Sequence, residues 1–328
     1  MGALLLLRGA YLGAAIVVLL VAAIPALRTR FLSYGARSDD TDATRRTTST
    51  AQNASSPSAT RLVTTLLDVL ASIRVPHGWF ASFYALSVAA SLYWAVELIS
   101  KGPAFTAIAR SQLPLQRHSS ASASMTVGQV QVAWLMMFLQ GTRRLYECLC
   151  WSKPSAASMW IGHWALGMLF YLCTSVSIWI EGTAALHNHV FAMQDFTLRA
   201  PSLRIFLGVL AYILAAGLQH DCHAYLASLK ASRNRRDGSA PSTDYSLPEH
   251  PAWNLSLSPH YFAECLIYLA IAIVAAPAHS VCNGTLLCAL AFVAINLGVT
   301  ADGTKKWYAR KFGEEHTRSR SRMIPFIF

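Results

Sequence analysis

The chain has 328 residues, of which 54% are hydrophobic and only 13% are charged, whereas about a quarter of the residues in an ordinary soluble domain are charged. This composition excludes a typical soluble globular domain. The net charge of +11 would suit a nucleic-acid partner, but the Lys and Arg residues lie in loops between apolar segments rather than on one folded face. We therefore expect no nucleic acid to bind.

Long apolar segments follow one another along the chain. They lie at 3–27, 78–99, 129–150, 157–180, 203–228, 256–276 and 280–299. A helix of about 20 residues crosses a hydrocarbon core of about 30 Å, and none of these runs shows the alternation of apolar and polar residues that is typical of a membrane barrel. The first segment is too long for the apolar part of a typical signal peptide. The sequence thus predicts an all-α, polytopic membrane protein with about seven transmembrane helices.

Between the first two apolar segments the sequence predicts an amphipathic helix. Its apolar residues recur at helical spacing while charged residues lie elsewhere on the wheel: Leu62, Val63, Leu66, Leu67, Leu70 and Ile73 against Arg61, Asp68 and Arg74. This pattern is typical of a helix that lies in the membrane interface. The stretch before it, 36–60, is rich in Ser, Thr, Ala and Asp and is predicted to be disordered. Polar loops are predicted at 101–128 and 231–250.

The basic residues predict an orientation in the membrane. They concentrate around alternate loops: Arg28, Arg30, Arg37, Arg45 and Arg46 after the first apolar segment, Arg143, Arg144 and Lys153 around the turn between the third and fourth, Lys230, Arg233, Arg235 and Arg236 between the fifth and sixth, and seven Lys or Arg residues in the tail. The other loops contain far fewer. The positive-inside rule then places the tail in the cytosol and the N-terminus on the opposite side.

Polar side chains inside apolar segments are candidate site residues, because they are costly in a bilayer. In the third segment Gln140, Arg143, Arg144 and Glu147 are three or four residues apart and share one helical face. Two interpretations stay open at this point. An Arg–Glu pair could close the end of the helix, or the cluster could form a polar pocket for an anionic ligand.

Further polar residues occur at the same predicted side of two other segments. The fifth segment ends with Gln219, His220 and His223, and the sixth begins with His260 and Glu264. A His-x-x-His pair raises the possibility of a metal, but no further His or carboxylate cluster accompanies it, so we expect no metal site. All these residues lie at the predicted cytosolic ends of their segments. We therefore expect them to converge on one site.

The carboxyl end carries a pattern of basic and aromatic residues. It consists of Lys306, Trp307, Tyr308, Lys311, Phe312, Arg320 and the closing Ile324, Pro325, Phe326, Ile327 and Phe328. With residues 258–264 and 140–147 and the aromatic residues Trp79, Phe80, Phe83 and Tyr84, this pattern resembles the steroid 5α-reductase family, and particularly its polyprenol (polyprenal) reductase branch. The clear resemblance covers about residues 130–328.

The resemblance implies seven transmembrane helices in the endoplasmic reticulum membrane and NADPH bound from the cytosolic side. The chain has no Gly-x-Gly-x-x-Gly fingerprint. Family members bind cofactor at the positions that match Gln219, His223, Lys230, His260, Glu264, Tyr308 and Arg320. Arg143 and Arg144 are candidate partners for the cofactor phosphates, because Arg offers a two-pronged donor to such oxygens.

Three positions depart from the family pattern. Steroid-reducing members have Asn and Asp where this chain has Gln219 and His223, which favours the polyprenal branch. The family usually carries a His three residues before the tail Tyr, and here Lys305 stands at that position. We therefore do not expect this chain to use that position in the way in which family members use the His.

The chemistry implied by this branch favours polyprenal over polyprenol as the substrate, because only a conjugated carbonyl makes the double bond electrophilic. A hydrogen-bond donor must then stabilise the developing enolate oxygen. The candidates are Tyr308, Gln140 and Tyr84. The long-chain polyprenoid would enter from the bilayer, and the product would serve dolichol synthesis for protein N-glycosylation.

The resemblance also suggests an organisation of the chain. Residues 1–60 would hold the first transmembrane helix and a disordered cytosolic loop, 61–128 the amphipathic helix, the second transmembrane helix and a polar loop, and 129–328 the reductase domain with the NADPH site. The alternatives are a steroid 5α-reductase or a trans-2-enoyl-CoA reductase of the same superfamily. A seven-helix receptor or transporter is a more distant one.

Overall fold

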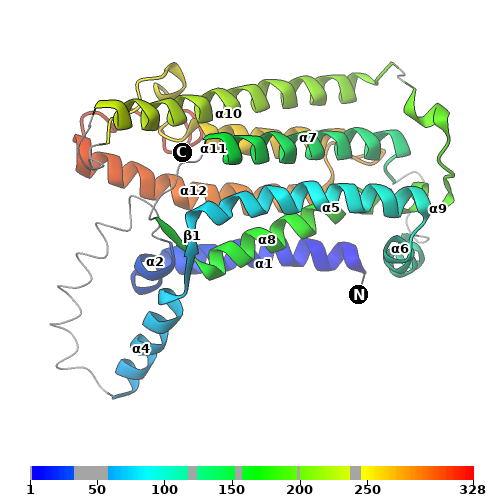
Figure 1. Cartoon of the computed structure of the whole chain (residues 1–328). Coiled ribbons are helices and arrows are strands. Elements are labelled where there is room, and N and C mark those ends of the chain that lie inside the picture. Colours follow the sequence, from blue (N-terminus) through cyan, green and yellow to red (C-terminus); the bar gives the residue numbers. More distant parts are fainter. Residues whose placement is uncertain (1, 33–57, 117–123, 152–156, 198–199, 237–244) are drawn as a thin grey trace.

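The protein is a bundle of long helices (Figure 1). The structure, a computed structural model, describes residues 2–32, 58–116, 124–151, 157–197, 200–236 and 245–328. Its long, roughly parallel or antiparallel helices are α1 (Ala3–Ala23), α5 (Ala81–Ser100), α7 (Val127–Trp151), α8 (Ile161–Ser177), α10 (Leu203–Arg236), α11 (Pro259–Val274) and α12 (Gly284–Phe312). Each falls on one of the seven predicted apolar segments. The all-α polytopic class is confirmed.

Not all of these helices have the length and composition of a membrane span. Those that do, within the described part of the chain, are the five stretches Ala3–Ala23, His77–Ser100, Ile161–Asn188, Leu203–Leu229 and Gly284–Phe312. α11 is apolar but has only 16 residues. α7 is not among the five, because the polar residues of its second half interrupt its apolar sequence. These polar residues face the inside of the bundle, where Arg144 and Glu147 are buried.

The shorter elements lie at the ends of the bundle. They are α2 (Pro25–Phe31), α4 (Ser58–Ser72), the 3-10 helices η1 (His77–Phe80), η3 (Ile180–Gly182), η4 (Met193–Phe196) and η5 (Pro251–Trp253), α6 (Pro103–Gln116) and α9 (Thr183–Asn188). Within the described ranges the one sheet pairs β1 (Arg74–Pro76) with β2 (Ser158–Trp160), antiparallel. The predicted amphipathic helix at 61–74 is thus present as α4. The predicted disordered stretch 36–60 lies almost entirely outside the described residues.

The predicted polar loop at 101–128 was wrong in part, because α6 occupies half of it. Glu97, at the end of α5, accepts a hydrogen bond from the backbone N–H of Phe105 in the first turn of α6, at 2.9 Å. A carboxylate at the start of a helix accepts a hydrogen bond from a backbone N–H that has no partner within the helix. It also interacts favourably with the positive end of the helix dipole. Phe105 is fully buried. These tertiary contacts stabilise a helix that the local sequence, with Pro114, does not suggest.

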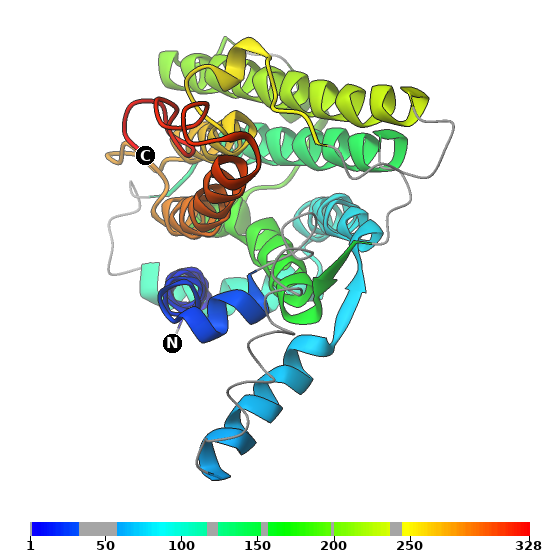
Figure 2. The ribbon, with the colours of Figure 1, turned by 90° about the vertical axis from the view of Figure 1, so that its left-hand side faces the viewer.

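The helices form layers when the bundle is viewed along its length (Figure 2). α10 and α7 lie along one side, α1 and α2 along the other, and α12, α11, α8 and α5 fill the space between them. α5 and α7 approach closely at Gly141, where an added Cβ would lie only 2.9 Å from Ser87 Oγ. The tail, residues 313–328, folds back at the end where α7, α10 and α12 finish and α11 begins. We call this end of the bundle the tail end.

Candidate active site

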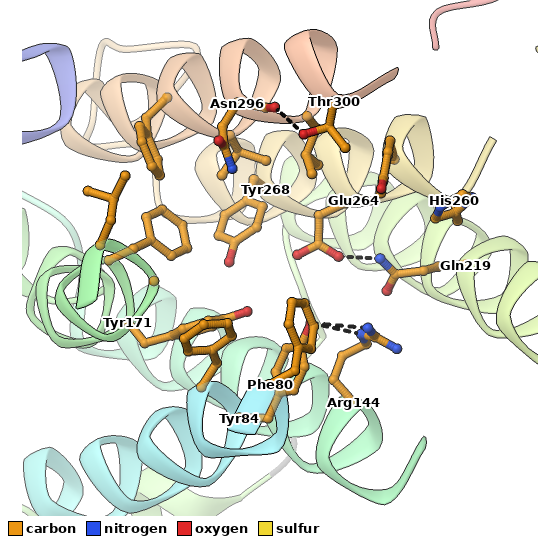
Figure 3. A pocket seen from close by; sticks show the side chains of 18 of the residues that line it. Phe80, Tyr84, Arg144, Tyr171, Gln219, His260, Glu264, Tyr268, Asn296 and Thr300 are labelled. Carbon is orange, nitrogen blue, oxygen red and sulfur yellow. Dashed lines mark hydrogen bonds between the residues drawn. The ribbon is translucent and has the colours of Figure 1, made fainter. Parts of the chain in front are cut away.

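A cavity opens inside the bundle toward the tail end, between seven helical elements (Figure 3). Its lining consists of Phe80 from η1, Phe83 and Tyr84 from α5, Arg144 from α7, His163, Leu166, Gly167, Phe170 and Tyr171 from α8, Gln219 and His223 from α10, His260, Tyr261, Glu264 and Tyr268 from α11, and Phe292, Val293, Asn296, Leu297 and Thr300 from α12. The predicted boundary between residues 128 and 129, where the reductase domain was expected to begin, stays a prediction. The cavity takes residues from both sides of that boundary.

One half of the cavity is apolar and aromatic. The ring of Phe170 lies 5.7 Å from that of Tyr268 and 5.4 Å from that of Phe292, measured between centroids. Gly167 lets α8 come close to α5 here, because an added Cβ would lie 2.8 Å from the ring of Phe83. A wall of this kind holds an apolar ligand chain without any directional bond.

The other half is a polar network that joins α7, α10 and α11. Gln140 donates hydrogen bonds to Gln219 at 3.0 Å and to Glu264 at 3.3 Å, and Gln219 also donates to Glu264. Arg143 donates to Gln140 at 2.7 Å and to Gln219. The expected convergence of these residues from three helices is therefore confirmed. Gln140 and Arg143 support the cavity from behind, since neither lines it directly.

At the outer edge of the network, several side chains converge on Glu147. It accepts hydrogen bonds from Arg143 at 2.5 Å and from Arg144. The Nδ1 atoms of His220 and His223 lie 2.8 and 2.9 Å from its two carboxylate oxygens. The first interpretation of the α7 residues is thus confirmed, because Glu147 pairs with the two Arg residues. Arg144 also lines the cavity, and the binding of an anionic ligand there stays a prediction.

Tyr84 and Arg144 form a donor pair on the cavity wall. Arg144 donates to the Tyr84 oxygen from Nε at 3.2 Å and from a terminal nitrogen at 3.1 Å, and its guanidinium lies 4.8 Å from the ring centroid. Because the hydroxyl oxygen accepts two hydrogen bonds from a cation, its own proton is left to donate, and the positive charge strengthens it as a donor. Of the three predicted donors, Tyr84 is the one in the cavity lining.

Tyr268 and Tyr171 were missed by the sequence analysis. Their side chains point into the same space from α11 and α8, facing Glu264 and Tyr84 (Figure 3). Tyr268 is 1% exposed, and its hydroxyl has no hydrogen-bond partner among the described residues. A Tyr inside an apolar segment looks like ordinary core. The signal that could have found Tyr268 is its position four residues after Glu264, on the same face of α11.

Beside the cavity, the approach to α11 contains buried polar atoms that no described residue satisfies. They are Trp253 Nε1, Ser258 Oγ, His260 Nδ1 and Arg320 NH1. The tail holds this approach in place, since Leu257 N donates to Ser321 O at 2.9 Å and Ser256 Oγ donates to Met323 O at 2.8 Å. A buried polar atom without a partner is costly. This set of mainly donor groups fits a ligand rich in oxygen atoms, such as a nucleotide cofactor.

The remaining predicted site residues lie around this region. Tyr308, in α12, is not in the cavity lining and packs against Trp307 and Phe312, with centroids 5.2 and 5.7 Å away. Lys230 lies in α10, and its side chain is outside the described residues. Lys305, at the position where the family has a His, donates to the backbone oxygen of Arg320 at 2.6 Å. The roles assigned to these residues stay predictions.

The His residues of α10 contact a carboxylate of α7. His220 and His223 both contact Glu147. Within the described ranges no group of three His, Cys, Asp or Glu side chains is arranged to hold a metal ion.

The chain is similar in sequence to several polyprenal reductases. The chain is 26% identical over 299 residues to polyprenal reductase 2 of Oryza sativa subsp. indica, which covers 78% of this chain and 80% of the relative. It is 28% identical over 199 residues to a polyprenal reductase of Xenopus laevis, covering 61% and 59% of the two chains. To the polyprenal reductase of Homo sapiens it is 22% identical over 257 residues, covering 77% and 78%.

The family assignment rests on the second half of the chain. Residues 157–328 match the 3-oxo-5-alpha-steroid 4-dehydrogenase family. This range contains α8, α10, η5, α11, α12 and the tail. Its residues supply most of the cavity lining and all four unsatisfied polar atoms beside it. The resemblance seen in the sequence is confirmed, and the chain belongs to the 3-oxo-5-alpha-steroid 4-dehydrogenase family.

Proposed function

We propose that this chain is an NADPH-dependent polyprenal reductase, which saturates the α-isoprene double bond of a long-chain polyprenal on the route to dolichol for protein N-glycosylation. Family membership makes the chain an oxidoreductase that acts on a carbon–carbon double bond. The names of the relatives support the substrate. The observation that carries the proposal is the two-sided cavity, which combines an aromatic wall with hydroxyl groups that have protons to donate.

The cofactor would lie along the tail end of the cavity. Gln219, His223, His260, Glu264 and Arg320 would hold it, and Arg143, Arg144 and Lys230 stay candidate partners for its phosphates. Trp253 and Ser258 join this set, because their side-chain polar atoms are buried and unsatisfied among the described residues. When bound, NADPH supplies the hydride for the β-carbon of the conjugated aldehyde.

The residues of the cavity would act on the carbonyl end of the substrate. Tyr84, with Arg144 behind it, would donate a hydrogen bond to the carbonyl oxygen as negative charge develops there. Tyr268 would donate a second hydrogen bond from the opposite wall. Both donors are fixed before the substrate arrives, since they are buried in the bundle. Tyr308 and Gln140 are less well placed for this role, because neither lines the cavity.

The location follows from the same proposal. The protein would reside in the endoplasmic reticulum membrane with its tail in the cytosol. There the apolar isoprenoid chain of the substrate would stay in the bilayer, while the water-soluble cofactor binds at the tail end of the bundle. The family match gives no support to a receptor or transporter.

A substrate panel tests the proposal. The purified full chain in lipid nanodiscs would be given NADPH with a polyprenal, a steroid enone or a trans-2-enoyl-CoA, and the saturated product measured by mass spectrometry. We expect the polyprenal to be reduced with the highest kcat/KM. Turnover of the enoyl-CoA or the steroid without turnover of the polyprenal would contradict the substrate. Absence of NADPH binding would contradict the cofactor.

A genetic test reaches the same question in cells. A strain that lacks its own polyprenal reductase accumulates unsaturated polyprenoids if this step is blocked. Expression of the chain should restore dolichol and full protein glycosylation, and a Tyr84→Phe variant should restore them poorly.

A further inference from the structure

The amphipathic helix α4 carries an apolar face that no described residue covers. Leu62, Val63, Leu66, Val69, Leu70 and Ile73 are each between 46% and 64% exposed. At 100° per residue they lie within about 120° of the helix circumference. Leu67, which the sequence analysis assigned to this face, is half-buried on another side, and Val69 takes its place. Six exposed aliphatic side chains in one stripe indicate an interaction surface.

α4 is fixed to the bundle by its polar side and its C-terminal end. Asp68 pairs with Arg30 of α2 at 2.8 Å. The Trp160 indole donates to the backbone oxygen of Leu70 at 2.8 Å, and its ring lies 4.5 Å from the ring of Phe31. Gly162 leaves room for this indole, because an added Cβ would overlap it. The β1–β2 pair follows directly. The helix therefore has one orientation relative to the long helices.

That orientation places α4 at the edge of the membrane-spanning bundle. The helix projects sideways beyond α1 and α2, across the direction of the long helices and near their tail end (Figures 1 and 2). Helix α1, which leads into α2, exposes a belt of aliphatic side chains that includes Ile16 and Leu20, and the exposed Ile24 follows its last residue. Arg28 in α2 and Arg61 at the start of α4 are exposed near the same end. Basic residues next to an apolar stripe match the surface of a bilayer with anionic lipids.

We propose that α4 lies in the membrane interface at the tail end of the bundle, with its apolar face in the lipid. The occupant of this face is the bilayer, since the Asp68 and Trp160 contacts hold α4 beside α2, and α2 directly follows the exposed aliphatic belt of α1. The helix thereby orients the mouth of the cavity at the membrane surface, because β1 leads directly into Phe80 and β2 into His163, both in the cavity wall. The location of α4 does not depend on which substrate is reduced.

Photo-crosslinking of the full chain tests this location. The protein would carry the photoreactive residue p-benzoylphenylalanine at one position and be placed in nanodiscs that contain an alkyne-tagged phospholipid. The test variant is Leu66→p-benzoylphenylalanine. The matched control is Arg61→p-benzoylphenylalanine, about 140° away around the same helix. The variant Ile16→p-benzoylphenylalanine, on the exposed face of α1, serves as the positive control. Monodisperse purification and an unchanged thermal unfolding midpoint show that each variant is folded.

We expect lipid labelling at position 66 to match that at position 16 and to exceed that at position 61 roughly fivefold or more. An adduct at twice the mass of the chain would overturn the proposal in favour of a second copy. A crosslink to residues 33–57 would overturn it in favour of a segment of the same chain. Equal labelling at 61 and 66 would show that the helix has no fixed apolar side in the membrane.

Discussion

Two buried polar clusters occupy opposite ends of the bundle and differ in how completely they are satisfied. At the end away from the tail, Glu181 accepts hydrogen bonds from Arg8 at 3.0 Å and from the backbone and hydroxyl of Thr285 at 2.8 and 2.6 Å. Nearby, Gln129 donates to the backbone oxygens of Val274 and Ala276 at 3.0 and 2.7 Å. These groups tie α1, α7, η3, α11 and α12 together. Every contact of this cluster ends inside the protein.

The polar cluster at the tail end contains more hydrogen bonds, and yet some buried polar atoms there have no partner among the described residues. Of the seven buried side-chain atoms without a partner in the described ranges, six lie in or beside the cavity, and only Trp179 Nε1 lies at the other end. Both clusters cost desolvation energy. The cluster at the tail end offers more unsatisfied hydrogen-bonding capacity to a molecule from outside than the Glu181 cluster does. We infer that in this bundle the more saturated cluster is structural and the less saturated one binds a ligand.

We expect the largest effects when the central carboxylate of each cluster is removed, one at a time. Glu147→Ala leaves Arg143 and Arg144 without their carboxylate partner, so we expect a loss of about 3–5 kcal/mol in the free energy of unfolding together with loss of reductase activity. Glu181→Ala should also destabilise the protein, because Arg8 and Thr285 lose their acceptor. Its remaining folded fraction should reduce substrate normally. Thermal unfolding and activity per folded molecule measure both effects.

This pair can fail in a clear way. If Glu181→Ala abolished the activity of the folded protein, the saturated cluster would be part of the active site and the contrast between the two ends would be wrong.

The second effect concerns the donor pair on the cavity wall. Tyr84→Phe keeps the aromatic packing but removes the hydroxyl that Arg144 polarises. We expect kcat to fall about 10²–10³-fold, as for the loss of one oxyanion donor, with little change in the KM for NADPH. Steady-state kinetics on the nanodisc-embedded enzyme measure this. A fall in NADPH affinity with unchanged kcat would instead place Tyr84 on the cofactor side.

How much of this was predictable differs between the two clusters. The seven helices followed from the apolar runs, because a bilayer demands such lengths. The convergence of Gln140, Gln219 and Glu264 followed from their positions at the same ends of three segments. The Glu181 cluster did not, since Arg8, Glu181 and Thr285 belong to three different segments and no local pattern links them. Tyr268 was also missed, because its role depends on which face of α11 meets the cavity, and this is set by the packing of the helices.

The third prediction compares two buried tyrosines, one whose hydroxyl has hydrogen-bond partners and one whose hydroxyl has none among the described residues. The Tyr11 hydroxyl lies 3.2 Å from that of Thr174 and 3.0 Å from that of Ser177, whereas the Tyr268 hydroxyl has no partner among the described residues. Tyr11→Phe should cost about 1 kcal/mol of stability and leave kcat unchanged. Tyr268→Phe should lower kcat roughly tenfold, the worth of one neutral hydrogen bond to the substrate, without loss of stability. The opposite pattern would refute the comparison.

The smallest effect tests how the tail shapes the cofactor side. Lys305 donates to the backbone oxygen of Arg320 at 2.6 Å, so Lys305→Met should loosen the position of Arg320 and raise the KM for NADPH roughly threefold, about 0.6 kcal/mol. The neighbouring Lys306 is a matched control, because it pairs with Asp302 on the exposed side of α12. Lys306→Met should leave the KM unchanged, since an exposed ion pair contributes little. Equal effects of the two substitutions would mean that general positive charge, and not the contact with Arg320, attracts the cofactor; raising the salt concentration would then reduce the difference from wild type in both.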